Sequence, residues 1–179
     1  MTAKIEKEFS FLAAVHFEGD FLINDYTLTL FMDVETENQR EQVIAIERAN
    51  YFLHNYVASS VFVQDTEKKA IDNYTKAGIS TLVLPEEPYD QIIGIILLSK
   101  LNAIMEGKLI ITDIVFMSTL AADIKFHTPA EEVVEFAGKN WWNDSSTRTK
   151  NINKKDKIVA FNENEWSEIG LTWKEPESE

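Results

Sequence analysis

The stretch that most constrains the fold is LVLPEEPYDQIIGIILLSKLNAIMEGKLIITDIVF, residues 82–116. It joins an apolar strand pattern, a proline-rich corner, an apolar helix pattern and a second apolar strand pattern. Because the residue before a proline avoids the α conformation, Pro85 and Pro88 prevent a helix from beginning before about residue 88. From Gln91 to Glu106 the pattern is apolar on nearly every side of a helical wheel, which indicates a helix buried on most sides.

Within this helix, Gly94 permits a close backbone approach to a neighbouring element, and Gly107 ends the helix. Asp90 is expected to cap the helix or to lie in its first turn. Residues 108–118 then form the strongest strand pattern of the chain, and residues 123–128 are expected to return as its hairpin partner.

The N-terminal part predicts a hairpin followed by a long helix. Residues 9–17 and 27–34 are rich in β-branched and aromatic side chains, which favours an antiparallel pair. Thr36 is three residues before Gln39, a capping-box spacing, so a helix is expected over about 37–58.

A strand–helix–strand pattern follows this helix. The strands are expected over 60–64 and 79–85, and the helix between them is expected to begin at a Thr66 cap and to end at Gly78. Such a connection is right-handed and makes its two strands parallel.

These elements predict an α+β (mixed α/β) fold: a sheet of about six strands, an N-terminal antiparallel hairpin, two long apolar helices, one short strand–helix–strand crossover and a C-terminal polar arm. Residues 1–142 are expected to form a single domain, closing with a short helix over 129–142. Residues 143–179 are expected to form the polar arm, with one short strand over 157–161 and an acidic tail.

The order hairpin, long helix, second helix, hairpin resembles the tunnelling fold of pterin- and purine-converting enzymes. In that family a glutamate anchors the heterocycle. The resemblance is one of element order: the paired histidines of the zinc-dependent members are missing after the first strand, and the 60–84 strand–helix–strand unit would be an insertion. Membership of the family is not inferred from it.

The composition excludes several classes of function. The net charge of −13 disfavours broad contact with nucleic-acid phosphates or with an anionic membrane. The chain has no cysteine, and no secretory signal pattern is visible. Its longest apolar run, 92–98, is far shorter than the roughly 20 residues of a membrane span. A cytoplasmic protein is therefore expected. No glycine-rich phosphate loop, HExxH or GxSxG motif is present.

Two acidic residues at the proline-rich corner form the candidate ligand site. Glu86 and Glu87 follow a strand and precede a helix, the position at which ligands collect in open α/β sheets, and Tyr89 lies beside them. A carboxylate pair there could bind a cation or the amino group of a ligand. The alternative is that both acids only complement the dipole of the helix that follows.

A second set of residues predicts an interface. Ile44 and Tyr51 lie on the polar side of the first long helix, next to His54, so a neighbouring surface is expected to cover them. Trp141 and Trp142 precede the polar arm and are expected to dock on another subunit. The arm also carries basic residues that, with these tryptophans, would suit single-stranded nucleic acid, but the acidic bulk of the chain argues against that use.

Three histidines, His16, His54 and His127, could converge on a zinc ion, but histidines far apart in a sequence more often lie apart in the structure, each with its own partner or exposed. No metal or cofactor is therefore predicted. The leading interpretation is a cytoplasmic, non-catalytic protein that acts through homo-oligomerisation or through binding a protein partner. The alternatives are a small-molecule site near Glu86 and Glu87, with enzymatic activity left open, and an acidic mimic of nucleic acid.

Overall fold

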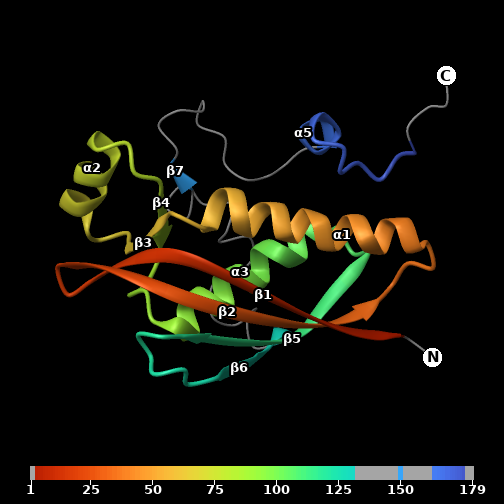
Figure 1. The fold of residues 1–179 in the computed structure, drawn as a ribbon, viewed down its shortest axis with the longest axis horizontal. Helices are drawn as coiled ribbons and strands as arrows, with labels where there is room; N and C mark the ends of the chain where they lie inside the picture. Colours follow the sequence, from red (N-terminus) through yellow and green to blue (C-terminus); the bar gives the residue numbers. More distant parts are fainter. Residues whose placement is uncertain (1–2, 132–148, 151–162, 176–179) are drawn as a thin grey trace.

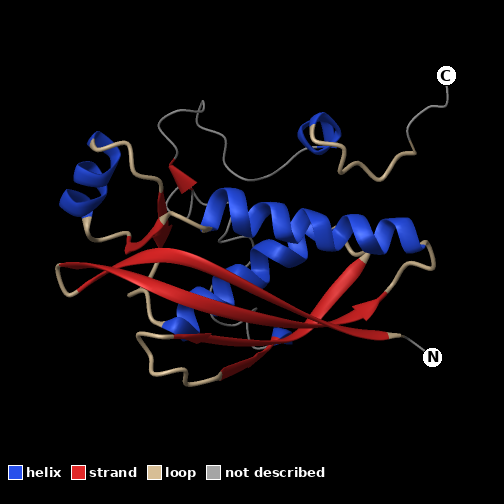
Figure 2. Ribbon diagram, in the orientation of Figure 1, coloured by secondary structure: helices blue, strands red, loops and turns tan. Residues whose placement is uncertain are grey.

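The computed structural model of this protein describes residues 3–131, 149–150 and 163–175. The strands are β1 (Lys4–Phe17), β2 (Asp20–Val34), β3 (Val61–Gln64), β4 (Thr81–Leu84), β5 (Leu109–Ser118), β6 (Phe126–Pro129) and β7 (Thr149–Lys150). The helices are α1 (Gln39–Phe52), which continues as the π-helical turn η1 (Leu53–Val57), α2 (Lys68–Lys76), α3 (Asp90–Met105) and α5 (Glu163–Glu168). Figure 1 and Figure 2 show helices packed against one mixed sheet, which confirms the α+β class.

The sheet has the order β6-β5-β2-β1-β3-β4-β7. β1 and β2 form the expected antiparallel hairpin, whose register pairs Lys4 with Asp33 and Phe17 with Asp20. β5 pairs with β2, and β6 with β5, also antiparallel. β3 runs parallel to β1 and β4 parallel to β3, so the predicted crossover is confirmed.

The main core lies between one face of the sheet and the helices α1 and α3. Alternate side chains of β1 and β2 point into it, as the period of two along a strand requires. α3 is buried along nearly its whole length, and Gly94 makes the expected close approach: a Cβ at this position would lie 3.2 Å from Ile114 Cδ1 and from Phe116 Cβ. The apolar pattern of residues 91–106 therefore identified the central helix correctly.

The cap of α1 differs from the prediction. Asn38, not Thr36, is the N-cap, and its side chain accepts a hydrogen bond from the Arg40 amide. Thr36 Oγ1 instead accepts from the Asn38 amide and donates to Glu41 Oε2, so it fixes the turn before the helix. The Thr66 cap of α2 was also wrong, because α2 begins at Lys68 after Glu67.

The segment 163–175 packs against α1 within the same chain (Figure 1). Trp166 of α5 is 0% exposed and belongs to the main core. The Arg48 guanidinium lies over both Trp166 and Trp173, 4.6 and 3.7 Å from the ring centroids, and donates to the Leu171 carbonyl at 2.7 Å. The guanidinium of Arg40 donates to the carbonyls of residues 172, 173 and 174. Most of the expected helix over 129–142 and all of the expected strand over 157–161 lie outside the described residues.

No helix in the described ranges is both long and apolar enough to cross a bilayer.

Candidate functional site

The hairpin extends well past the start of α3. β1 and β2 have 14 and 15 residues, about 45–50 Å at roughly 3.3 Å per residue. α3 has 16 residues, about 24 Å at 1.5 Å per residue. One helix therefore cannot cover the whole hairpin. A cavity of about 420 Å³ lies where the hairpin end, the start of α3 and the β5–β6 turn meet.

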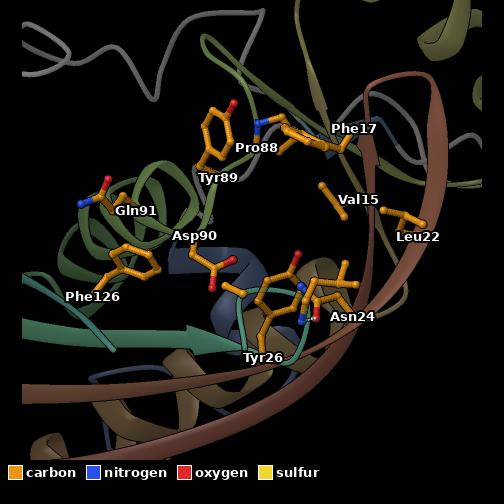
Figure 3. A pocket seen from close by; sticks show the side chains of 12 residues that line it. Val15, Phe17, Leu22, Asn24, Tyr26, Pro88, Tyr89, Asp90, Gln91 and Phe126 are labelled. Carbon is orange, nitrogen blue, oxygen red and sulfur yellow. Dashed lines mark hydrogen bonds between the residues drawn. The ribbon is translucent and has the colours of Figure 1, made fainter. Parts of the chain in front are cut away.

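The walls of this cavity are mainly apolar and aromatic (Figure 3). The hairpin contributes Val15, Phe17 and Leu22, the start of α3 contributes Tyr89, and the β5–β6 region contributes Phe126. The Phe17 and Tyr89 rings meet edge to face with centroids 5.2 Å apart. The polar groups on the wall are few, which is the usual composition of a small-molecule site.

Asp90 supplies the buried acid of the cavity. It lies in the first turn of α3, is 8% exposed, and its Oδ1 accepts a hydrogen bond of 3.0 Å from the Ser118 hydroxyl. Its Oδ2 is buried and has no hydrogen-bond partner among the described residues. Burial raises the pKa of the Asp90 carboxyl above its ordinary value, and the bond from Ser118 offsets part of that rise.

Asn24 and Tyr26 lie beside Asp90 on the floor of the cavity (Figure 3). Both are almost fully buried. Burial raises the pKa of the Tyr26 phenol, a side-chain hydrogen bond from Asn24 lowers it, and the negative charge of Asp90 raises it further. The phenol therefore stays protonated and is a hydrogen-bond donor at any physiological pH.

The residues predicted as a ligand site divide between the cavity and the surface. Tyr89 lines the cavity, whereas Glu86 and Glu87 are exposed and do not line it. Glu87 still affects the site through Tyr89, because a hydrogen bond with the Glu87 carboxylate raises the pKa of the Tyr89 phenol. The corner thus carries three acids, at 86, 87 and 90, and only the third is buried.

The residues predicted as an interface also separate. Ile44 is buried, Tyr51 is half-buried against the Trp166 ring at 6.1 Å, and His54 is exposed. The segment 163–175 supplies a neighbour for this side of α1 from the same chain. Trp141 and Trp142 lie outside the described residues.

The three histidines do not form a metal site, because no group of three or more His, Asp or Glu side chains within the described ranges is placed to hold a metal ion. His16 Nδ1 is 2.8 Å from the Tyr74 hydroxyl, and its Nε2 is 3.7 Å from Glu67 Oε2, so its ring joins β1 to α2. His54 and His127 are exposed.

Asp90, Asn24 and Tyr26 are site residues that the sequence pattern did not predict. A signal was available for two of them. Asp90 is the one acid inside the first turn of an otherwise apolar helix, and Asn24 is a polar residue in the inward-facing series of a strand. Nothing in the sequence distinguishes Tyr26 from an ordinary core aromatic residue.

No protein-family model matches this chain, and no curated protein matches it. An uncharacterized protein from Wolinella succinogenes has a similar structure, with a TM-score of 0.54 and 10% sequence identity over 72% of this chain and 98% of that chain. At that identity the similarity shows a shared fold alone. A catalytic-residue mutant of 6-pyruvoyltetrahydropterin synthase from Plasmodium vivax gives a TM-score of 0.43 and 11% identity over 72% of this chain and 97% of that chain. That similarity is too low to support a functional argument.

Proposed function

We propose that this protein binds a small, flat, largely apolar molecule with at least one polar N–H group in the cavity at Asp90. The observation that carries the proposal is the Asp90 Oδ2 atom, which is buried and has no hydrogen-bond partner within the described ranges. A buried acceptor without a partner costs free energy, and a ligand donor would remove that cost.

The shape and lining of the cavity support the same class of ligand. Its volume of about 420 Å³ lies within the range of roughly 300–1,000 Å³ of known small-molecule sites. The Phe17, Tyr89 and Phe126 rings suit a planar ligand, because aromatic groups pair favourably in stacked or edge-to-face arrangements. Ionised Asp90 would accept a hydrogen bond from the ligand, and that bond would be stronger than one to a neutral acceptor.

The test is an NMR titration of the isotope-labelled protein with two sets of bicyclic aromatic compounds. One set carries ring N–H or amino groups, and the other, represented by naphthalene, carries none. We expect the first set to shift the amide signals of residues 15–26 and 89–91, and naphthalene to shift them less. Asp90→Asn should weaken binding of the first set at least tenfold, whereas the exposed Glu86→Gln should leave it unchanged.

A titration in which no N–H compound shifts these signals would contradict the proposal. Binding that is equal in wild type and Asp90→Asn would also contradict it, because Asp90 would then make no contact with the ligand. If Glu86→Gln abolished binding instead, the exposed pair at 86 and 87 would be the site.

Self-association is a second candidate function, favoured by the sheet face opposite α1 and α3. Leu12, Phe21 and Ile23 are exposed there, on the neighbouring strands β1 and β2. The same face carries Glu8 from β1 and Lys125 from the segment before β6. A two-fold contact between copies could set Glu8 of one copy against Lys125 of the other.

Light scattering should then report more than one chain per particle, and Ile23→Lys should yield monomers. A wild-type mass of one chain would contradict this candidate.

A further inference from the structure

The orientation of the Asn24 side chain is fixed by its neighbours. Asn24 Oδ1 lies 3.0 Å from the Leu120 backbone nitrogen and 2.9 Å from Thr119 Oγ1. A backbone N–H can only donate, so the Asn24 atom facing Leu120 must be the oxygen. Both acceptor positions of that oxygen are then in use, so it cannot also accept the proton of the Tyr26 hydroxyl.

This orientation determines what the Tyr26 hydroxyl does. Its proton cannot go to Asn24 Oδ1, whose two acceptor positions are occupied, so it remains to be donated. The ring cannot turn away to find another partner, since it is stacked against Phe11 and Phe116, each with centroids 5.4 Å away, and meets Phe62 edge-on at 5.6 Å. The proton does not go to Asp90 Oδ2, which has no partner among the described residues.

The Asp90 carboxyl is oriented in the same way. The Ala121 amide donates to Ser118 Oγ at 3.3 Å, so the Ser118 hydroxyl proton is left for Asp90 Oδ1, at 3.0 Å. Oδ2 is the carboxyl atom that remains for a ligand, and it accepts when Asp90 is ionised. The floor of the cavity therefore offers one acceptor, Asp90 Oδ2, beside one donor, the Tyr26 hydroxyl (Figure 3).

We propose that Tyr26 determines the ligand class of this cavity, which takes the cis-amide edge of a lactam ring and discriminates against the two-donor edge of an amidine. A lactam presents an N–H next to a carbonyl oxygen, so its N–H meets Asp90 Oδ2 and its oxygen accepts from Tyr26. An amidine or aminopyridine presents two donors, and the second donor meets the Tyr26 hydroxyl proton, which leaves both groups without a partner. This inference rests on the binding function proposed above.

Two probes of nearly equal shape separate the possibilities: isoquinolin-1(2H)-one, which has the lactam edge, and 1-aminoisoquinoline, which has two donors when protonated. Dissociation constants are measured by calorimetry near pH 6.5 for wild type and for Tyr26→Phe, which keeps the aromatic packing and removes only the hydroxyl. We expect wild type to bind the lactam at least tenfold more tightly than the amine. We expect Tyr26→Phe to lose roughly fivefold to tenfold in affinity for the lactam and none for the amine.

The outcomes separate this inference from the binding function. If wild type prefers the amine, or if Tyr26→Phe weakens both probes equally, the donor role of Tyr26 is refuted while binding at Asp90 stands. If neither probe binds wild type, the lactam inference is refuted, and the binding function is refuted as well if no compound of the N–H set shifts the amide signals. A thermal melt of Tyr26→Phe close to that of wild type establishes that the variant is folded.

Discussion

Replacing Trp166 by alanine tests whether the segment 163–175 completes the core of this protein. The indole is 0% exposed, contacts the Tyr51 ring at 6.1 Å and covers the Arg48 guanidinium at 4.6 Å. Truncation of a buried tryptophan to alanine costs about 3–5 kcal/mol, since both transfer free energy and a cavity contribute. Loss of one aromatic face from Arg48 adds about 0.5–2 kcal/mol, although the two terms are not additive because the groups touch. We expect the free energy of unfolding to fall by about 4 kcal/mol, out of a typical total of roughly 5–15 kcal/mol.

The assay is urea unfolding followed by far-ultraviolet circular dichroism, with the slope of the transition compared between variants. Ile169→Ala is the matched control, because Ile169 belongs to the same segment and is 39% exposed. The control should change stability by no more than about 0.5 kcal/mol. A Trp166→Ala variant as stable as this control would refute the packing of the segment on α1.

Three further predictions concern α3. Asp90→Asn should become more stable relative to wild type as pH rises, because burial raises the pKa of Asp90 in the folded state. The cost of the ionised carboxyl is absent below its ordinary pKa and complete above the raised one. A difference between the urea midpoints of the two proteins that is flat from pH 3 to 7 would contradict this. Gly94→Ala should lower the free energy of unfolding by about 1–2 kcal/mol, because the added Cβ would lie 3.2 Å from the Ile114 and Phe116 side chains. This overpacking outweighs the gain in helix propensity. A variant more stable than wild type would show that β5 moves to make room for the methyl group. Ile96→Asp puts a carboxylate into the core at a residue 2% exposed and should cost several kcal/mol, so soluble protein that still melts cooperatively near the wild-type temperature would contradict its burial.

Local pattern accounts for most of the fold. Alternating side chains identify the β1–β2 hairpin, and the apolar wheel of residues 91–106 identifies α3, because these periods follow directly from strand and helix geometry. The cap of α1 illustrates the limit of such patterns. Thr36 and Asn38 are both good capping residues, and the choice between them depends on how the chain leaves β2, which the capping preferences alone do not contain.

The site was less predictable because burial of a polar group is a tertiary property. Glu86, Glu87 and Asp90 are all acids near a helix start, and only the position of Asp90 inside the first turn separates it from the other two. Asp90 is buried because it lies within the first turn and faces Ser118 of β5, 28 positions further along the chain. Tyr51 on α1 is half-buried against Trp166, which lies in a distant part of the same chain, and the helical pattern that predicted an interface there contains no information on this neighbour.

The hydrogen bonds from the two arginines of α1 to the segment 163–175 determine when this part of the core can form during translation. Arg48 and Leu171 are 123 positions apart, and Arg40 and Lys174 are 134 apart. Translation therefore delivers α1 and Glu106, which pairs with Arg48 at 3.2 Å, long before the tryptophans whose rings lie against the Arg48 guanidinium. The core closes only after residue 173 has emerged, so a nascent chain stalled before that point would present this side of α1 to chaperones.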